Sequence, residues 1–122
     1  MKSFDDVVFN LHPIDLRDGE KAVAPLLLAQ ETVEGVFATV RDKVIFTDRR
    51  VIAVDVQGIG KKVSYCSLPY SRIVSFCVET AGFFDLDSEL TLHLPSGKKA
   101  VFEFTAGFDI RTLCRAIAAR VL

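Results

Sequence analysis

Apolar and polar side chains alternate along the middle of the chain, from about residue 31 to residue 105. A period of two is typical of β-strands that bury one face and leave the other in water. Polar or glycine-containing turns separate the alternating segments. About seven strands are therefore predicted, within residues 31–40, 42–48, 49–57, 62–68, 71–80, 88–94 and 100–105.

Individual strands carry further signals. In the segment SELTLHL every second residue is a leucine, so Leu90 and Leu92 are predicted to face inward. The next strand returns with Phe102 and Phe104 inward, after a tight turn in which Gly97 supplies a permissive backbone. Gly35 interrupts the first strand and predicts a β-bulge there.

The last segment changes from a period of two to the helical period. Its apolar residues recur at intervals of three and four, which predicts an amphipathic helix over residues 108–122 with Asp109 as its N-cap. The stripe consists of Ile110, Leu113, Cys114, Ile117 and Val121.

The N-terminal segment has less pattern. Residues 1–18 are predicted to form a weakly structured arm or a short helix, because Pro13 opposes one continuous helix. A short helical turn is expected after it, with Asp18 as a candidate cap and Pro25 limiting its length.

These elements define the fold class. The 122 residues suffice for one domain, so residues 1–122 are taken as a single mainly β (α+β) unit. Two small antiparallel sheets packed face to face would bury the apolar strand faces but leave open ends. A helix with a single apolar stripe can plug one of those ends. This is the arrangement of a pleckstrin-homology (PH) barrel or sandwich with a C-terminal helix.

The sequence also resembles a known family. The pieces IFTDRR, GKKVSY, LPYSRI, FCVETAG and FDLDSEL together are similar to the bacterial PH-like domain family, and the resemblance runs from about Gly19 to Leu122. It implies a PH-like barrel and closed cyclic rings of single-domain protomers, usually five. It also implies a shared polar surface where strands of neighbouring protomers meet, and it brings no catalytic residues.

Composition narrows the function classes. Fifteen Lys and Arg residues against sixteen Asp and Glu residues give a net charge of -1, so no general attraction to nucleic acid is expected. The apolar run AVAPLLLA is too short to span a bilayer, and the N-terminus lacks a signal-peptide pattern. We therefore expect a cytoplasmic protein in which Cys66, Cys77 and Cys114 are reduced core thiols.

The densest acidic segment of the chain raises three alternatives. Its polar residues are Glu79, Thr80, Asp85, Asp87, Ser88 and Glu89. They can form a solvated turn, a protein-contact surface, or a metal or catalytic site. An EF-hand loop counted from Asp85 would need Gly and Glu where Leu90 and Ser96 stand, so that match fails. The residues favour the turn, and the family resemblance favours the contact surface.

Other candidate sites are less well supported. The segment GIGKK lacks the spacing of a phosphate-binding loop. Arg41 and Lys43 flank Asp42 in the first predicted hairpin, and Arg49 with Arg50 is expected at the opposite end of the strands, which leaves too few converging charges for a polyphosphate headgroup.

The remaining candidate side chains are two histidines and two arginines. His12 and His93 are isolated in the sequence, which disfavours zinc. Arg111 and Arg115 are expected on the solvated face of the terminal helix, where they can pair with carboxylates of a neighbouring subunit.

The prediction is therefore a non-enzymatic module with no cofactor, metal or catalytic residue. It is expected to form a cyclic homo-oligomer and to present the acidic segment to a protein partner that the sequence does not identify. The alternative is a membrane-peripheral protein that binds acidic-lipid headgroups.

Overall fold

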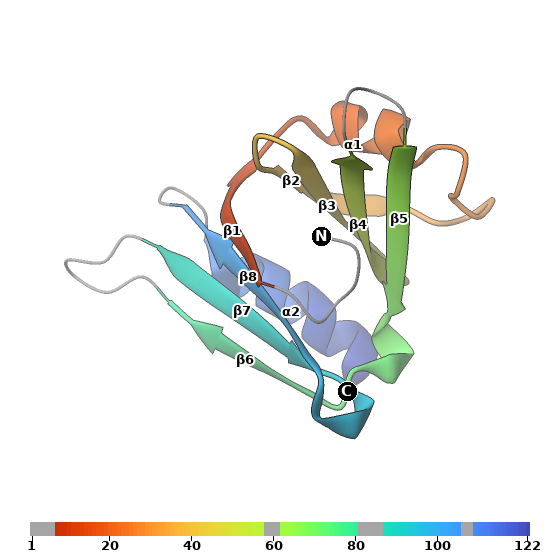
Figure 1. Ribbon diagram of the computed structural model, residues 1–122. Coiled ribbons are helices and arrows are strands. Elements are labelled where there is room, and N and C mark those ends of the chain that lie inside the picture. Colours follow the sequence, from red (N-terminus) through yellow and green to blue (C-terminus); the bar gives the residue numbers. More distant parts are fainter. Residues whose placement is uncertain (1–6, 58–61, 81–86, 106–108) are drawn as a thin grey trace.

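An eight-stranded β-sheet dominates the computed structural model, which describes residues 7–57, 62–80, 87–105 and 109–122 (Figure 1). The strands are β1 (Val7–Pro13), β2 (Val33–Ala38), β3 (Asp42–Thr47), β4 (Arg50–Gln57), β5 (Lys62–Pro69), β6 (Ser75–Glu79), β7 (Ser88–His93) and β8 (Lys99–Phe104). The α-helices are α1 (Leu16–Val23) and α2 (Ile110–Val121), and the short 3-10 turns are η1 (Tyr70–Arg72) and η2 (Pro95–Gly97).

The sheet runs in the order β5-β4-β3-β2-β1-β8-β7-β6 and does not close, so β5 and β6 are its edges within the described residues. Strand β1 curves between the two halves of the sheet (Figure 1). The predicted mainly β, PH-like fold class is confirmed. Two details differ: one continuous sheet replaces two separate sheets, and the pairing of β1 with β8 is parallel whereas the other pairings are antiparallel.

The prediction of an N-terminal arm was wrong, because residues 7–13 form β1 at the centre of the sheet. The strand is hard to recognise in the sequence because its backbone is irregular. Asn10 has a φ of 57°, and the register with β8 shifts between Val8 and Leu11. This irregularity breaks the alternation by which the other strands are recognised. Leu11 nevertheless ends up fully buried in the main core.

Helix α1 begins earlier than predicted. Asp15, not Asp18, is its N-cap and accepts a hydrogen bond from the Arg17 N–H at 2.8 Å. The helix packs closely on β2, because a Cβ at Gly19 would collide with the side chain of Val36. Together with the chain that follows it, α1 covers a second apolar cluster on the outer face of β2, β3 and β4. That cluster consists of Val23, Val33, Val36, Ile45, Ile52 and Val54.

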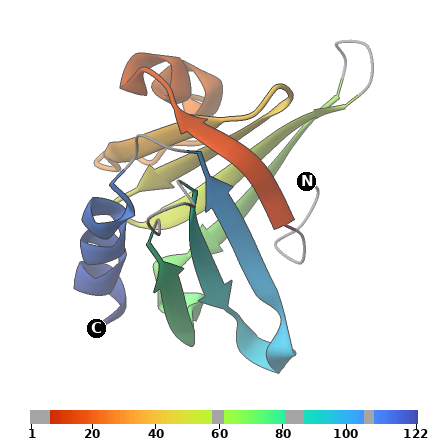
Figure 2. The same cartoon turned by 90° about the vertical axis from the view of Figure 1, so that its left-hand side faces the viewer.

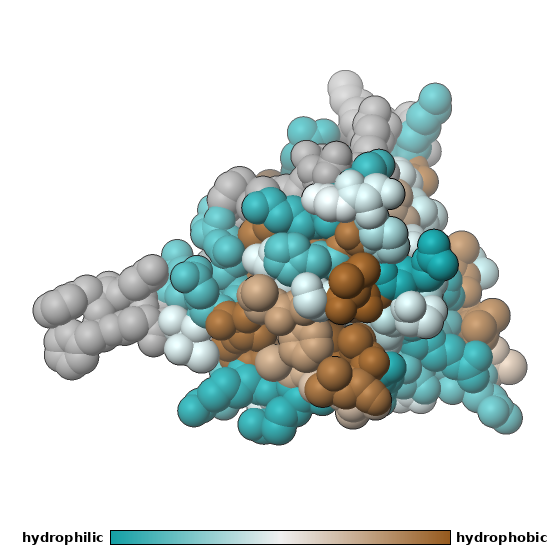
Figure 3. All heavy atoms as spheres, turned by 90° about the horizontal axis from the view of Figure 1, so that it is seen from below, coloured by the Kyte–Doolittle hydropathy of each residue, from teal (hydrophilic) through white to brown (hydrophobic). Residues whose placement is uncertain are grey.

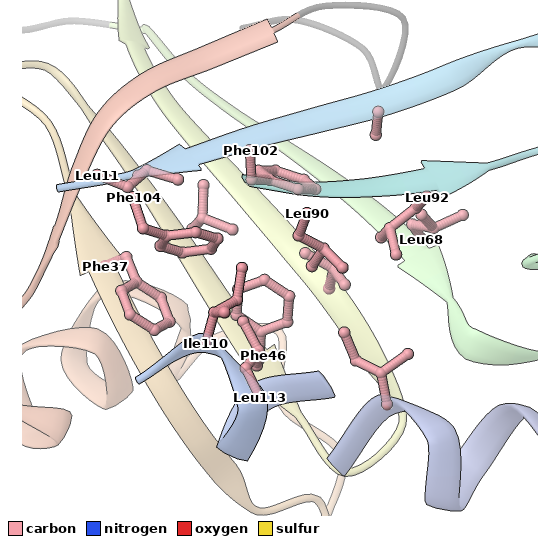
Figure 4. Close-up of a cluster of buried hydrophobic side chains, with 14 of the residues drawn as sticks. Leu11, Phe37, Phe46, Leu68, Leu90, Leu92, Phe102, Phe104, Ile110 and Leu113 are labelled. Atoms are coloured by element: carbon pink, nitrogen blue, oxygen red, sulfur yellow. The ribbon is translucent and has the colours of Figure 1, made fainter. Parts of the chain in front are cut away.

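The main core lies between the inner face of the sheet and α2 (Figure 4). Phe37 is at its centre, with edge-on contacts to Phe46 at 5.7 Å and to Phe104 at 4.9 Å between ring centroids. Such T-shaped pairs add to the free energy gained by burial. The leucines of β7 and the two phenylalanines of β8 point into this core as predicted.

Helix α2 seals one end of the curved sheet, at the lower left in Figure 2. Asp109 caps it as predicted and accepts from the Arg111 N–H at 3.1 Å. Ile110, Leu113 and Ile117 are buried against the strands, so the predicted apolar stripe is the contact surface. The helix therefore closes the core that the open sheet would expose.

The predicted turns and edges are largely confirmed. Gly97 has a φ of +76° in the turn between β7 and β8, where a side chain would be strained. A register shift in β2 between Val33 and Gly35 is the predicted bulge. Val74 lies before β6 and is 67% exposed, whereas Phe76 and Val78 of β6 pack against the main core.

A buried ion pair joins the connection after α1 to the turn between β3 and β4. Arg50 donates from Nε to Glu31 Oε2 and from one terminal nitrogen to Oε1, both at 2.9 Å. Thr47 donates to the same carboxylate at 2.7 Å, and the Leu28 N–H donates at 3.1 Å. Burial of the carboxyl disfavours its charge, but these hydrogen bonds outweigh burial and lower the pKa of Glu31 to about 2.

Replacing Ile117 by alanine should lower the free energy of unfolding by about 3 kcal/mol, because it opens a cavity where α2 meets the sheet. Urea unfolding followed by circular dichroism measures this. Arg115→Ala, at an exposed position of the same helix, is the control and should change stability by less than about 0.5 kcal/mol. Equal effects of the two substitutions would contradict the role assigned to the stripe.

Acid should weaken the fold through Glu31. Its folded pKa lies below the ordinary value of 4.5, so the ion pair contributes fully above about pH 4.5 and its contribution is lost as the pH falls toward 2. Lowering the pKa of Glu31 from 4.5 to about 2 corresponds to about 3 kcal/mol of folding stability at neutral pH. Glu31→Gln should therefore reduce stability at about pH 7 and flatten the loss between about pH 4.5 and pH 2. Glu34→Gln, which alters the more exposed pair with Arg120, is the control.

Candidate protein-contact surface

The outer face of β6, β7 and β8 carries the polar residues of the predicted site. Strand register puts these side chains in rows, because residues directly opposite one another on neighbouring strands point to the same side. One row consists of Glu79, Glu89 and Glu103; the next consists of Cys77, Thr91 and Val101; the third consists of Ser75, His93 and Lys99. The intervening residues, such as Leu90 and Phe102, point into the core.

The row of three glutamates is the most charged feature of this face. Glu79 is exposed, whereas Glu89 and Glu103 are half-buried. Thr91 Oγ1 lies 3.5 Å from Glu89 Oε1, a weak hydrogen bond. Carboxylates directly opposite one another repel, so this row costs some stability. Glu103 was not part of the predicted set; the alternation of β8 with its inward phenylalanines was the signal that would have placed it outward.

The structure divides the predicted site residues. Thr80 and Asp87 are exposed at the ends of β6 and β7, near the acidic row. Asp85 lies outside the described residues. Ser88 is 5% exposed and sits opposite Phe104, so its side chain is on the inner face and does not share a surface with Glu89. Its Oγ has no hydrogen-bond partner among the described residues. Binding by this surface stays a prediction.

Two expectations about thiols and histidines need correction. Cys77 is exposed and is therefore not a core thiol, whereas Cys66 and Cys114 are half-buried. His93, which is isolated in the sequence, lies with its Nε2 3.8 Å from Cys77 Sγ. Strand pairing brings the two together across sixteen positions, which sequence spacing alone does not reveal.

The basic residues weighed for headgroup binding are divided between two ends of β3, as predicted. Arg41 is exposed and Lys43 half-buried at one end, whereas Arg50 at the other end is held by Glu31. Asp42 and Asp55 lie opposite each other beside the first pair. Burial and then a hydrogen bond with Asp55 raise the pKa of Asp42. Carboxyl groups at this position oppose binding of a polyphosphate.

The exposed side of α2 is basic. Arg115 is exposed, Arg111 pairs with Asp109 at 3.0 Å, and Arg120 pairs with Glu34 of β2 at 2.6 Å. Figure 3 shows apolar residues gathered at the centre of the face seen from below, with hydrophilic residues around them. The C-terminal end of α2 and the start of β6 meet on this side of the molecule. Val74 directly precedes β6, Leu122 directly follows α2, and both side chains are exposed.

A cavity of about 100 Å³ lies between α2 and the strands β2 and β3. It is lined by Glu34, Gly35, Phe37, Phe46, Tyr70, Thr112, Leu113 and Ala116. The Tyr70 hydroxyl donates to the Thr47 carbonyl at 2.7 Å. Burial, followed by the charge of Glu34, raises the pKa of Tyr70, so it remains a neutral phenol.

Within residues 7–57, 62–80, 87–105 and 109–122, no group of three or more His, Cys, Asp or Glu side chains is arranged to hold a metal ion. In the same part of the chain, no helix has the length and apolar character needed to cross a membrane.

Comparison with known proteins decides the family. The model of the bacterial PH domain matches residues 2–121. The chain belongs to the bacterial PH domain family. This confirms the resemblance inferred from the sequence pieces.

Relatives and solved structures agree with the membership. The uncharacterized protein YjqA of Bacillus subtilis (strain 168) is 40% identical over 123 residues, which cover 96% of this chain and 98% of YjqA. A crystal structure of a DUF1696 family protein with a PH domain from Shewanella loihica PV-4 is 36% identical, with a TM-score of 0.80 and coverage of 93% of this chain and 99% of that one.

A second crystal structure, of a PH domain from Shewanella amazonensis SB2B, is 40% identical and has a TM-score of 0.67. The likeness covers 89% of this chain and 90% of that one.

Neutralising the middle of the acidic row should stabilise this bacterial PH domain. Glu89→Gln removes a charge that lies opposite both Glu79 and Glu103 and keeps an acceptor for Thr91. The free energy of unfolding should rise by about 0.5 kcal/mol at low salt, and the gain should shrink at high salt. Glu20→Gln, at an exposed position on α1, is the control. A loss of stability in Glu89→Gln would contradict repulsion within the row.

Proposed function

We propose that this bacterial PH domain is a non-enzymatic, cytoplasmic interaction module that assembles head to tail into a closed ring of identical protomers. The ring presents the acidic surface of each protomer to a protein partner with a basic patch. The family resemblance implies a ring of about five protomers. Such a ring closes only when the rotation that relates one protomer to the next adds up to a full turn.

The row of carboxylates on Glu79, Glu89 and Glu103 carries this proposal. Glu79 and Glu89 lie directly opposite each other and repel at a cost in stability. Charges kept at such a cost are typical of surfaces used for binding. The row also lies next to β6, whose outer edge is unpaired within the described residues.

A head-to-tail contact needs two different patches on one protomer. The unpaired outer edge of β6 is one, and the exposed side of α2 with Arg115 is the other, so the outer face of β6–β8 with its glutamate row stays open to the partner. The apolar patch of Figure 3 adds surface whose burial stabilises the contact. Because the patches differ, the contact is heterologous and builds rings rather than simple two-fold dimers.

Ring formation would change binding through multivalency. A partner that contacts one acidic surface weakly can contact several copies at once, and its effective affinity then exceeds that of a single contact by about 10²-fold or more. In this way a small domain can act as a binding platform.

Size-exclusion chromatography with light scattering tests the ring. The mass expected for the wild-type chain is about five times the protomer mass of 13.5 kDa, with no further growth at higher concentration. Val74→Glu, which places a charge in the apolar contact beside β6, should shift the protein toward the monomer, whereas Glu20→Lys on α1 should not. Glu89→Lys should leave the mass unchanged, because Glu89 faces the partner and not the ring contact.

A wild-type chain that elutes as a monomer at high concentration would refute the ring. Loss of assembly in Glu89→Lys would refute the assignment of the acidic face to the partner.

A further inference from the structure

A thiol and an imidazole lie side by side on the outer face of β6 and β7. Cys77 Sγ and His93 Nε2 are 3.8 Å apart, within hydrogen-bond range for sulfur. The contact is diagonal, because Cys77 pairs with Thr91 in the strand register and His93 pairs with Ser75. An Nε2 without a proton accepts from the thiol, and a protonated Nε2 donates to the thiolate.

The solvent can reach this pair. Cys77 is exposed on an edge strand and His93 is half-buried, whereas Cys66 and Cys114 are both half-buried. Thiol–disulfide exchange requires a thiolate that an incoming disulfide can approach in line. Cys77 combines access with a proton acceptor at its sulfur, so it meets both requirements.

We propose that Cys77 is a modification site that forms mixed disulfides with small disulfide molecules, and that His93 is its proton acceptor. In the first step the Cys77 proton moves to His93 Nε2. The thiolate sulfur then attacks one sulfur of the disulfide, so a new S–S bond forms as the old one breaks. The departing thiolate takes the electron pair and then the proton from His93. Cys77 is oxidised, and the disulfide is reduced to one free thiol.

The neighbouring charges indicate which disulfide reacts best. Glu79 lies two residues along β6 on the same face as Cys77, and Glu89 lies diagonally across on β7. Lys99 is opposite His93 on the side away from Cys77, and Glu103 lies beyond Glu89 on β8. The carboxylates flank the sulfur, so they attract a cationic disulfide and repel an anionic one. The site thus takes small cationic disulfides. This inference does not rest on the proposed ring.

The experiment uses the full chain with cystamine, a cationic disulfide, at about pH 7, and follows the intact mass before the modified peptide is mapped. Cys77 should be modified at least about tenfold faster than Cys66 or Cys114. His93→Gln should slow the Cys77 reaction about fivefold at about pH 7, because the proton acceptor beside the sulfur is lost. His12→Gln, at an exposed position on β1, should match the wild type.

Glutathione disulfide, which is anionic, supplies the charge comparison, and it should react more slowly than cystamine by a factor that shrinks at high salt. Circular dichroism confirms that each variant is folded. Three results would overturn the inference: faster modification of Cys66 or Cys114, an unchanged rate in folded His93→Gln at about pH 7, or a faster reaction with the anionic disulfide.

Discussion

The contact between the apolar stripe of α2 and the inner face of the sheet is the interaction on which the other features depend. An eight-stranded sheet that curves without closing leaves its phenylalanine-rich face open at one end. Ile110, Leu113 and Ile117 remove that end from water. Once the inner face is held in this way, alternation along each strand decides what faces outward. The burial of Leu90 and Phe102 therefore fixes the outward direction of Glu89 and Glu103.

A second constraint acts at the β3–β4 turn. The bidentate pair of Glu31 and Arg50 ties the connection after α1 to this turn, and Thr47 completes its hydrogen bonds. Arg111 and Arg120 are likewise engaged with carboxylates of their own chain. The domain has a balanced net charge, and Glu79, Glu89 and Glu103 form one row on the outer face of β6–β8.

Membership of the bacterial PH domain family describes the scaffold, and the site has to be argued from this chain's own residues. The same three strands carry the glutamate row, the exposed thiol and the histidine beside it. Their proximity follows from strand pairing, since residues far apart in sequence become diagonal neighbours on a sheet. A group attached to Cys77 would lie on the same face of β6 and β7 as Glu79 and Glu89.

Local periodicity, together with capping and turn residues, was enough to predict the strands between residues 33 and 104, the capped terminal helix and the inward leucines and phenylalanines. It missed β1, since Asn10 breaks the alternation and a parallel partner ninety residues away supplies the pairing. It placed Ser88 with the acidic surface and Cys77 in the core, and it left His93 isolated. All of these features depend on the register between strands. Register sets which face a residue at a strand end belongs to and which residues are its diagonal neighbours, and no local sequence pattern encodes it.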